Sequence, residues 1–396
     1  MEKSSRVYVE ILDTTLRDGA QSLPEEHQFE DGHKFYVARH ISDLGINTIE
    51  AGFPRTAGDN QEVYEIAQSI GNTSRNVQEW SSNQTESSNN FLRYPIIAAL
   101  ARADAKDIEV TWNAISPARY PLMHSFIATD PDHINTKFPG ATPEDIILKS
   151  KNSVRLARNL MSDHIFSRLE FSFEAASTTQ PQFLERIIKD VINEGADVIN
   201  VPDTVGQMEP FGIYNFYHKV IDWVISSNPS VIVSAHNHND QGLAVANSLS
   251  FIRAASDYAK SHSKDIKVQV ETTICGLGER AGNADVFPFV AALHSFGDQL
   301  PATIVWNFNR ELSVDVANNV MAHAKFCVNR QNPIVGRDIM RHRSGIHSDG
   351  IIKGDHRIYT PINPTEWGHS ENAIHETGKY QGNRGNRIAI KSFRSA

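Results

Sequence analysis

The sequence predicts a (β/α)8 TIM barrel of the α/β class, followed by a small, mostly helical C-terminal subdomain. The chain has 396 residues, which is enough for a barrel of ~250 residues and an appendage. Eight short apolar or β-branched runs alternate with longer helical patterns. This alternation stops after about Pro301. We therefore place the barrel at residues 1–305 and the accessory subdomain at residues 306–396.

The eight expected strands are separated by segments long enough for the crossover helix that a parallel strand pair requires. The strands are expected at residues 8–12, 47–51, 95–100, 122–128, 168–173, 198–201, 231–235 and 267–271. In residues 180–194, apolar side chains recur on one face of a predicted helix. Eight such units in series favour a closed barrel, and an open doubly wound sheet is the alternative.

The remaining segments have weaker patterns. Residues 72–90 are rich in Asn, Ser, Gln and Thr and predict a surface loop or an irregular helix end. Residues 311–326 predict a helix, whereas residues 332–351 mix Gly, Arg, His and Ser. The tail, residues 377–396, has no strong period.

Composition limits the class of protein. The net charge of −9 argues against nucleic acid as the main partner, because phosphate binding needs a basic surface. The two cysteines, Cys275 and Cys327, have no CxxC partner and predict neither a disulfide framework nor a thiolate metal cluster. No signal-peptide pattern and no apolar run of membrane-spanning length is present. We expect a cytoplasmic protein with small-molecule substrates.

The first polar cluster follows the first expected strand, at the end of the barrel where active sites form. Arg17 and Asp18 stand side by side there, just before Gly19. Taken alone, this pair could be a solvated ion pair. Its place between an apolar strand and the start of a helix is also typical of a functional site.

The second cluster follows the seventh strand. His236 and His238 are two residues apart on an extended segment, so their rings point to the same side. Imidazole is a common ligand for divalent metals. We expect Asn239 and Asp240 to hold the two rings by hydrogen bonds.

The third cluster, residues 276–283, follows the eighth strand and has three glycines, which let backbone approach a ligand closely. Asn283 offers an amide oxygen to a cation. Together with Asp18, His236 and His238 it predicts a mixed oxygen and nitrogen site suited to Mg²⁺, Mn²⁺ or Zn²⁺, with positions left for substrate. Amidohydrolase barrels carry a similar His-x-His after the first strand, so its place after the seventh counts against a hydrolase.

Other strand ends add polar groups to the same face of the barrel. Any one of them alone is more often structural, but together they would surround the metal with an acid, hydroxyls and imidazoles. These residues are Ser172 and Glu174 after the fifth strand, Asp203 and Thr204 after the sixth, His124 within the fourth and His133 just beyond it.

Three segments resemble the signatures of the group of 2-isopropylmalate, homocitrate and citramalate synthases. They are residues 12–21 (LDTTLRDGAQ), 236–240 (HNHND) and 278–283 (GERAGN). The resemblance extends over residues 9–364 and includes the stretches 125–129, 201–206, 242–249 and 344–350. These intervening stretches are most similar to the 2-isopropylmalate synthases.

The resemblance implies a Claisen-type condensation of acetyl-CoA with 3-methyl-2-oxobutanoate, the first step of leucine biosynthesis. It also implies a divalent metal, a monovalent cation such as K⁺, and a homodimer whose C-terminal subdomain reaches the neighbouring barrel. The implied metal ligands are Asp18, His236, His238 and Asn283; the implied catalytic residues are Arg17, Glu174, His347 and Tyr359; and the implied substrate-binding residues are Arg17, Leu100, His124, Ser172 and Thr204.

The resemblance does not fix every property. The full-length relatives carry a C-terminal leucine-binding domain, and this chain ends at Ala396, too early for one. We expect either a shortened chain or a form without leucine feedback. Pyruvate or 2-oxoglutarate could replace the branched oxo acid, as in citramalate and homocitrate synthases. A C–C lyase of the same fold would also fit, as would a non-catalytic metal-binding barrel, which would not need Arg17 or Glu174.

Overall fold

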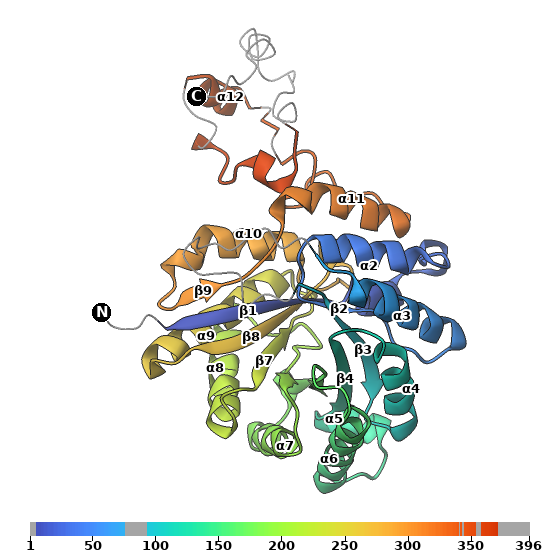
Figure 1. Ribbon diagram of the computed structural model, residues 1–396. Coiled ribbons are helices and arrows are strands. Elements are labelled where there is room, and N and C mark those ends of the chain that lie inside the picture. Colours follow the sequence, from blue (N-terminus) through green and yellow to red (C-terminus); the bar gives the residue numbers. More distant parts are fainter. Residues whose placement is uncertain (1–4, 76–92, 340, 343, 354–357, 371–396) are drawn as a thin grey trace. The chain divides into compact units, whose positions relative to one another are not determined.

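Eight parallel strands close into a barrel in the computed structural model, which describes residues 5–75, 93–339, 341–342, 344–353 and 358–370 (Figure 1). The strands are β1 (Arg6–Asp13), β2 (Thr48–Glu50), β3 (Ile96–Arg102), β4 (Pro121–Ala128), β5 (Arg168–Glu174), β6 (Val198–Asn200), β7 (Ile232–His236) and β8 (Ile266–Thr272). Neighbours in the chain pair in parallel, and β1 pairs with both β8 and β2, which closes the ring. The expected barrel is confirmed, and the open sheet is excluded.

Helices surround the strands (Figure 1). They are α2 (His33–Asp43), α3 (Ala57–Ser69), α4 (Ala105–Ile115), α6 (Pro143–Leu160), α7 (Pro181–Asn193), α8 (Pro210–Ser227), α9 (Ala244–His262) and α10 (Val286–Phe296). Local sequence explains where they begin: Thr142 and Asp145 form a capping box at α6, and α6, α7 and α8 have proline in the first turn. The helix expected at residues 180–194 is confirmed as α7, which buries Leu184, Ile187 and Val191.

Alternate residues of each strand face the barrel interior, because side chains of a strand alternate with a period of two. The interior is partly polar. Buried Gln269 of β8 donates its amide to both carboxylate oxygens of Glu170 on β5, each at 3.0 Å, and to Ser234 of β7 at 3.0 Å. This layer lies two residues below Ser172, His236 and Glu271, so the polar interior continues towards the carboxyl ends of the strands.

A ninth strand, β9 (Thr303–Val305), was not expected from the sequence. It pairs in parallel with the start of β1, at Arg6, Val7 and Tyr8. The strand has only three residues and follows a 3-10 turn, Gly297–Gln299, so it carries no periodic signal of its own.

The chain divides into two units, Met1–Phe308 and Asn309–Ala396. The second unit contains α11 (Ser313–His323), which confirms the expected helix, and α12 (Gly345–Lys353). Arg310 is paired there with Glu366 at 3.0 Å and lies against the ring of the buried Trp367. Most of the expected loop at residues 72–90 and the whole tail at 377–396 lie outside the described residues. None of the helices that the structure describes has the length and apolarity needed to span a membrane.

Candidate active site

A cavity of about 360 Å³ lies at the carboxyl ends of the barrel strands. The structure brings nine of the residues singled out by the sequence to its wall: Arg17, Asp18, Leu100, His124, Ser172, Glu174, Thr204, His236 and His238. They come from the ends of different strands or the turns that follow them, so the site exists only in the closed barrel.

The turn after β1 places Arg17 and Asp18. Residues Thr15–Gly19 form a single π-helical turn, and the Thr14 hydroxyl accepts the backbone N–H of Asp18 at 3.3 Å. Arg17 donates from Nε to Glu50 Oε2 at 2.7 Å and from Nη1 to Asp18 Oδ1 at 2.9 Å. The Arg17 side chain is only 12% exposed. The pair is therefore a buried, oriented group and not a solvated surface contact.

The two histidines face each other across a short gap. His236 ends β7, and its Nε2 lies 3.1 Å from Nε2 of His238. His236 Nδ1 lies 2.8 Å from Glu271 Oε2 at the end of β8. With Nδ1 held by this carboxylate, Nε2 is the nitrogen of His236 that faces the cavity. This is the carboxylate–histidine arrangement that orients metal ligands in proteins.

Ligand atoms of Asp18, His236 and His238 all lie within 4.8 Å of one another, and all three residues are buried. Burial and the nearby His236 lower the pKa of His238 to about 3, so its ring is neutral near pH 7. Burial opposes ionisation of Asp18, but the adjacent Arg17 guanidinium outweighs it and holds the pKa of Asp18 below the usual range. A carboxylate and two imidazole nitrogens are donor types that divalent cations such as Zn²⁺ bind, and, against the effect of burial, Glu271 beside His236 raises the pKa of that ring.

Asn283, from the loop after β8, contacts this group through Asp18. Its Nδ2 donates to Asp18 Oδ2 at 2.6 Å, while its buried Oδ1 has no hydrogen-bond partner among the described residues. A rotation of the amide would turn Oδ1 towards Asp18 and a cation between them. The loop needs its glycines for this placement, because a Cβ at Gly278 would collide with the Asn283 side chain and Gly282 has a φ of +95°.

A second buried group, His124, Glu170 and Glu271, also has ligand atoms within 4.8 Å of one another. Burial opposes the charge on His124, but Glu170 and Glu50 raise its pKa to about 9, so the ring is a cation near pH 7. Both ring nitrogens of His124 are engaged within the protein, Nδ1 by Glu50 at 2.7 Å and Nε2 by Ser172 at 2.6 Å. This group therefore fits a hydrogen-bond network, and the Asp18 group is the candidate metal site.

Asn239 and Asp240 do not hold the histidine rings, so that expectation was wrong. Asn239 Oδ1 accepts the backbone N–H of Ala244 at 3.2 Å, at the start of α9. Asp240 pairs with Arg280 at 2.7 Å. The partner of His236 is Glu271, which was not predicted from the sequence. The sequence did contain a signal for Glu271: it lies two residues after Gln269 on the same strand, so both side chains face the barrel interior.

Glu50, at the end of β2, was not predicted either. It is fully buried and accepts hydrogen bonds from Arg17, from Thr14 Oγ1 at 2.6 Å and from His124 Nδ1 at 2.7 Å. Burial opposes its charge, but Arg17 and His124 hold its pKa well below the usual range. His124 Nε2 in turn lies 2.6 Å from Ser172 Oγ, so one network connects β1, β2, β4 and β5.

Ala175, the residue after Glu174, connects the end of β5 to Thr204 by a hydrogen bond. Ala175 follows Glu174 with a φ of 60°, an uncommon conformation for a residue other than glycine, and its N–H donates to Thr204 Oγ1 at 3.0 Å. This hydrogen bond therefore fixes the position of Thr204 relative to Glu174. The Glu174 carboxylate contacts Lys137, the last residue of the short helix α5 (Pro131–Lys137).

Two other expected residues have local partners. Asp203 accepts from Ser177 Oγ at 2.7 Å and from the Met208 N–H at 3.1 Å, which is a structural role. His133 contacts Asp130, the residue that caps α5, at 3.0 Å. Neither residue is among those that line the candidate active-site cavity.

His347 and Tyr359 lie together in the second unit. Their rings are stacked, with centroids 4.1 Å apart and planes 13° from parallel. The close approach of the two segments leaves little space beside Gly350, since a Cβ there would lie 2.7 Å from Tyr359 Cε2. The two residues singled out by the sequence are therefore in direct contact with each other.

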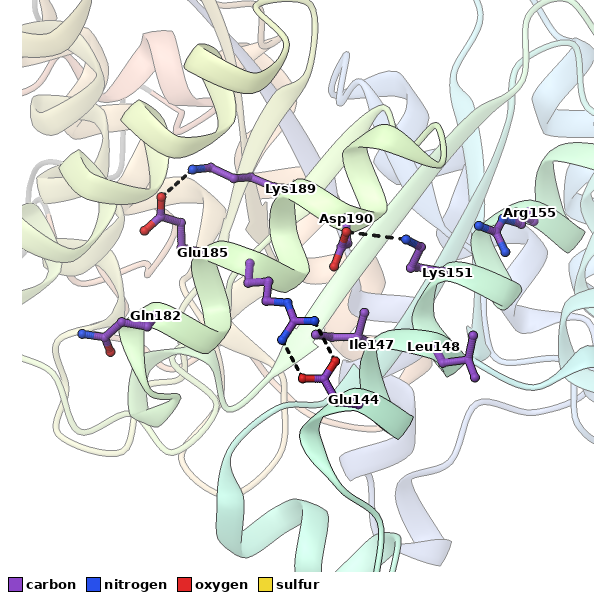
Figure 2. A pocket seen from close by; sticks show the side chains of 10 residues that line it. Glu144, Ile147, Leu148, Lys151, Arg155, Gln182, Glu185, Lys189 and Asp190 are labelled. Carbon is purple, nitrogen blue, oxygen red and sulfur yellow. Dashed lines mark hydrogen bonds and ion pairs between the residues drawn. The ribbon is translucent and has the colours of Figure 1, made fainter.

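A larger cavity of about 730 Å³ lies on the outside of the barrel between α6 and α7 (Figure 2). Its charged side chains neutralise one another: Arg186 with Glu144 at 2.6 Å, Lys151 with Asp190 at 3.6 Å and Lys189 with Glu185 at 2.5 Å. Among the described residues, none that lines it belongs to a candidate metal group or was singled out by the sequence. The smaller cavity at the barrel mouth is the candidate active site.

Comparisons with known proteins agree with this fold. The HMGL-like family model matches residues 8–318. A 2-isopropylmalate synthase of Halalkalibacterium halodurans is 34% identical over 389 residues, which cover 97% of this chain and 66% of that protein. A 2-isopropylmalate synthase of Pelotomaculum thermopropionicum is 36% identical over 395 residues, covering 98% of this chain and 68% of that protein. The chain thus spans about two thirds of the length of these relatives.

Among solved structures, an HMG-CoA lyase of Brucella melitensis superposes with a TM-score of 0.54 at 18% identity. The match covers 80% of this chain and 98% of the lyase, and it supports the barrel fold alone. Since the family model matches the barrel from β1 into α11, and relatives align along nearly the whole sequence, this chain belongs to the HMGL-like family.

Proposed function

We propose that the chain condenses acetyl-CoA with 3-methyl-2-oxobutanoate to give 2-isopropylmalate and free CoA, as a 2-isopropylmalate synthase of leucine biosynthesis. The observation that carries the proposal is the convergence of Asp18, His236 and His238 with Arg17 in one cavity. The names of the relatives support the same reaction.

A divalent cation, Mg²⁺, Mn²⁺ or Zn²⁺, would be held by Asp18, His236 and His238, with Asn283 as a fourth ligand after its amide rotates. When bound, such an ion supplies Lewis-acid polarisation of the oxo-acid carbonyl. The requirement for K⁺ stays a prediction from the resemblance.

Arg17 is suited to the negative charge that develops in the reaction. The acetyl methyl group loses a proton to a base, its carbon bonds to the keto carbon, and the keto oxygen becomes an alkoxide. Two N–H groups of Arg17 are engaged by Glu50 and Asp18, which fixes the guanidinium plane. Its remaining N–H groups are left to stabilise the alkoxide until it is protonated. Water then cleaves the thioester, and CoA leaves as the thiol.

Two hydroxyl groups are arranged as donors for the oxo acid. Thr204 Oγ1 accepts the Ala175 N–H, so its own proton is left for the substrate carboxylate. Ser172 Oγ accepts from His124 Nε2 at 2.6 Å and from Asn200 Nδ2 at 2.8 Å, so it too is left to donate. The pKa of about 9 for His124 makes it the donor of its pair.

The cavity wall favours an alkyl group on the oxo acid. Phe53, Leu100 and Phe126 contribute apolar surface. The lining cations Lys137 and Arg280 are paired with Glu174 and Asp240 and are not left over for a second carboxylate. This supports a branched monocarboxylate over 2-oxoglutarate, and it leaves pyruvate as the competing substrate.

Glu174 would orient the acetyl group or relay its protons. His347 is the proposed base, with Tyr359 beside it, and the two would act in the barrel of a second copy of the chain in a homodimer. Their stacking supports a shared role in this proposal.

The test is release of CoA thiol from acetyl-CoA with 3-methyl-2-oxobutanoate, pyruvate or 2-oxoglutarate, with and without a chelator. We expect the branched oxo acid to give the highest kcat/KM, with pyruvate lower by ~10- to 200-fold because its missing methyl groups reduce contact with the apolar wall. Chelator should abolish release. Arg17→Ala should lower turnover by ~10²–10³ while metal binding persists.

The matched control is Arg155→Ala, which removes an exposed arginine paired with Glu194 on the outer helices and should leave turnover unchanged. Absence of thiol release with every oxo acid would reject the proposed reaction. Equal turnover in Arg17→Ala and Arg155→Ala would reject the role of Arg17.

A further inference from the structure

We propose that Lys137 is a positioning residue of this site, whose ammonium group holds the Glu174 carboxylate in place at the barrel mouth. The inference rests on the proposed function in that Glu174 takes part in the reaction. Lys137 was not singled out from the sequence, because it lies 37 residues from its partner.

The contact engages the whole carboxylate. Lys137 Nζ lies 2.5 Å from Oε1 and 2.6 Å from Oε2 of Glu174. Both residues line the active-site cavity and also a neighbouring cavity of about 410 Å³, as does Phe126. The ion pair therefore belongs to the wall that the two cavities share, where a movement of Glu174 would change the shape of the site.

The backbone on both sides of the contact is fixed by other bonds. The Glu174 carbonyl accepts the Thr129 N–H at 3.1 Å, and the Ala175 N–H is held by Thr204. On the other side, Asp130 caps α5 through the Asp132 N–H at 3.0 Å, and the helix packs through buried Ile134. These bonds do not fix the side-chain torsions of Glu174. The contact of Lys137 with both carboxylate oxygens restrains them.

A purely stabilising role is the weaker explanation. The Lys137 side chain is 44% exposed, and exposed ion pairs contribute little to folding. Removal of Lys137 should leave the fold intact, so we expect the substitution to change the reaction rate and not the stability. A carboxylate misplaced by about 1 Å can cost ~10²-fold in rate.

The experiment compares Lys137→Met, Lys137→Arg and the control Lys189→Met. Lys189 forms a matched pair with Glu185 at 2.5 Å, is 46% exposed and lies on the outer helices (Figure 2). We expect Lys137→Met to lower kcat by ~10- to 100-fold with little change in KM for the oxo acid. Lys137→Arg should recover most of the rate, because guanidinium also bonds both carboxylate oxygens. In a Glu174→Gln background, Lys137→Met should cause no further loss.

Crystal structures of the same variants give a readout that does not depend on activity. We expect the Glu174 carboxylate to move in Lys137→Met and to keep its place in Lys189→Met. Equal turnover in the two methionine variants, or an unmoved carboxylate, would overturn the inference. A wild-type protein without condensing activity would reject the proposed function, and the crystal structures would still decide whether Lys137 positions Glu174.

Discussion

At the residue scale, the buried contact between His236 and Glu271 determines which nitrogen of the ring faces the cavity. Glu271 accepts from His236 Nδ1 at 2.8 Å and from Asn200 Nδ2 at 2.6 Å, and Arg17 Nη2 lies 4.0 Å away. A carboxylate in this position also increases the basicity of the ring as a ligand. The candidate metal site thus includes an orienting residue, Glu271, that is not itself one of the candidate ligands.

Glu271→Gln should therefore weaken metal binding without unfolding the protein. The amide keeps the volume and one acceptor but loses the charge, and we expect Mn²⁺ affinity to fall by roughly 10- to 100-fold in calorimetric titration. The control is Glu170→Gln: Glu170 is equally buried and bonds Gln269, and it belongs to the second buried group, so a loss of affinity in this variant alone would assign the metal to that group. Equal affinities in the two variants would show that Glu271 does not orient the ligand.

At the scale of elements, the loop after β8 depends on glycine conformation. Gly282 has a φ of +95°, and a Cβ there would collide with the Gly276 carbonyl oxygen. Gly282→Ala should cost roughly 1–3 kcal/mol of stability and should displace Asn283. Differential scanning calorimetry should show a larger fall in Tm than in Gly140→Ala, where φ is +81° but no atom lies within 4 Å of the added Cβ. A similar fall in both variants would contradict the steric argument.

The sequence was sufficient for the eight strands, because buried parallel strands appear as short apolar runs between amphipathic helices. The sequence also identified the cavity-lining residues that stand in distinctive clusters next to strand ends, such as Asp18 and His238. It was not sufficient for Glu50, Glu271 or Lys137. Each is a single charged residue whose partner lies 33 or more residues away, so only the closed barrel brings the pair together.

The errors have the same physical origin. Asn239 and Asp240 were expected to contact neighbouring rings, but the chain turns after His238. Asn239 then bonds the start of α9, and Asp240 meets Arg280 from the next loop. Local spacing predicts which residues share a face of a strand, and it does not predict the path of the loop that follows.

At the scale of the whole molecule, the site joins the two ends of the barrel sequence. Asp18 follows β1 and Asn283 follows β8, and they are hydrogen-bonded at 2.6 Å because these strands pair along seven residues. Closure of the ring creates the donor set, while the barrel interior below it is filled by the Glu170, Gln269 and Ser234 layer. The candidate metal site therefore exists only when the barrel is closed.

The most direct test is anomalous diffraction from crystals of the protein soaked in Mn²⁺. The account predicts one dominant peak at the barrel mouth, ~2.0–2.3 Å from an Asp18 carboxylate oxygen and from Nε2 of His236 and His238, with Asn283 Oδ1 turned towards it. Peaks confined to exposed carboxylates, with no peak between Asp18 and the two imidazoles, would contradict it.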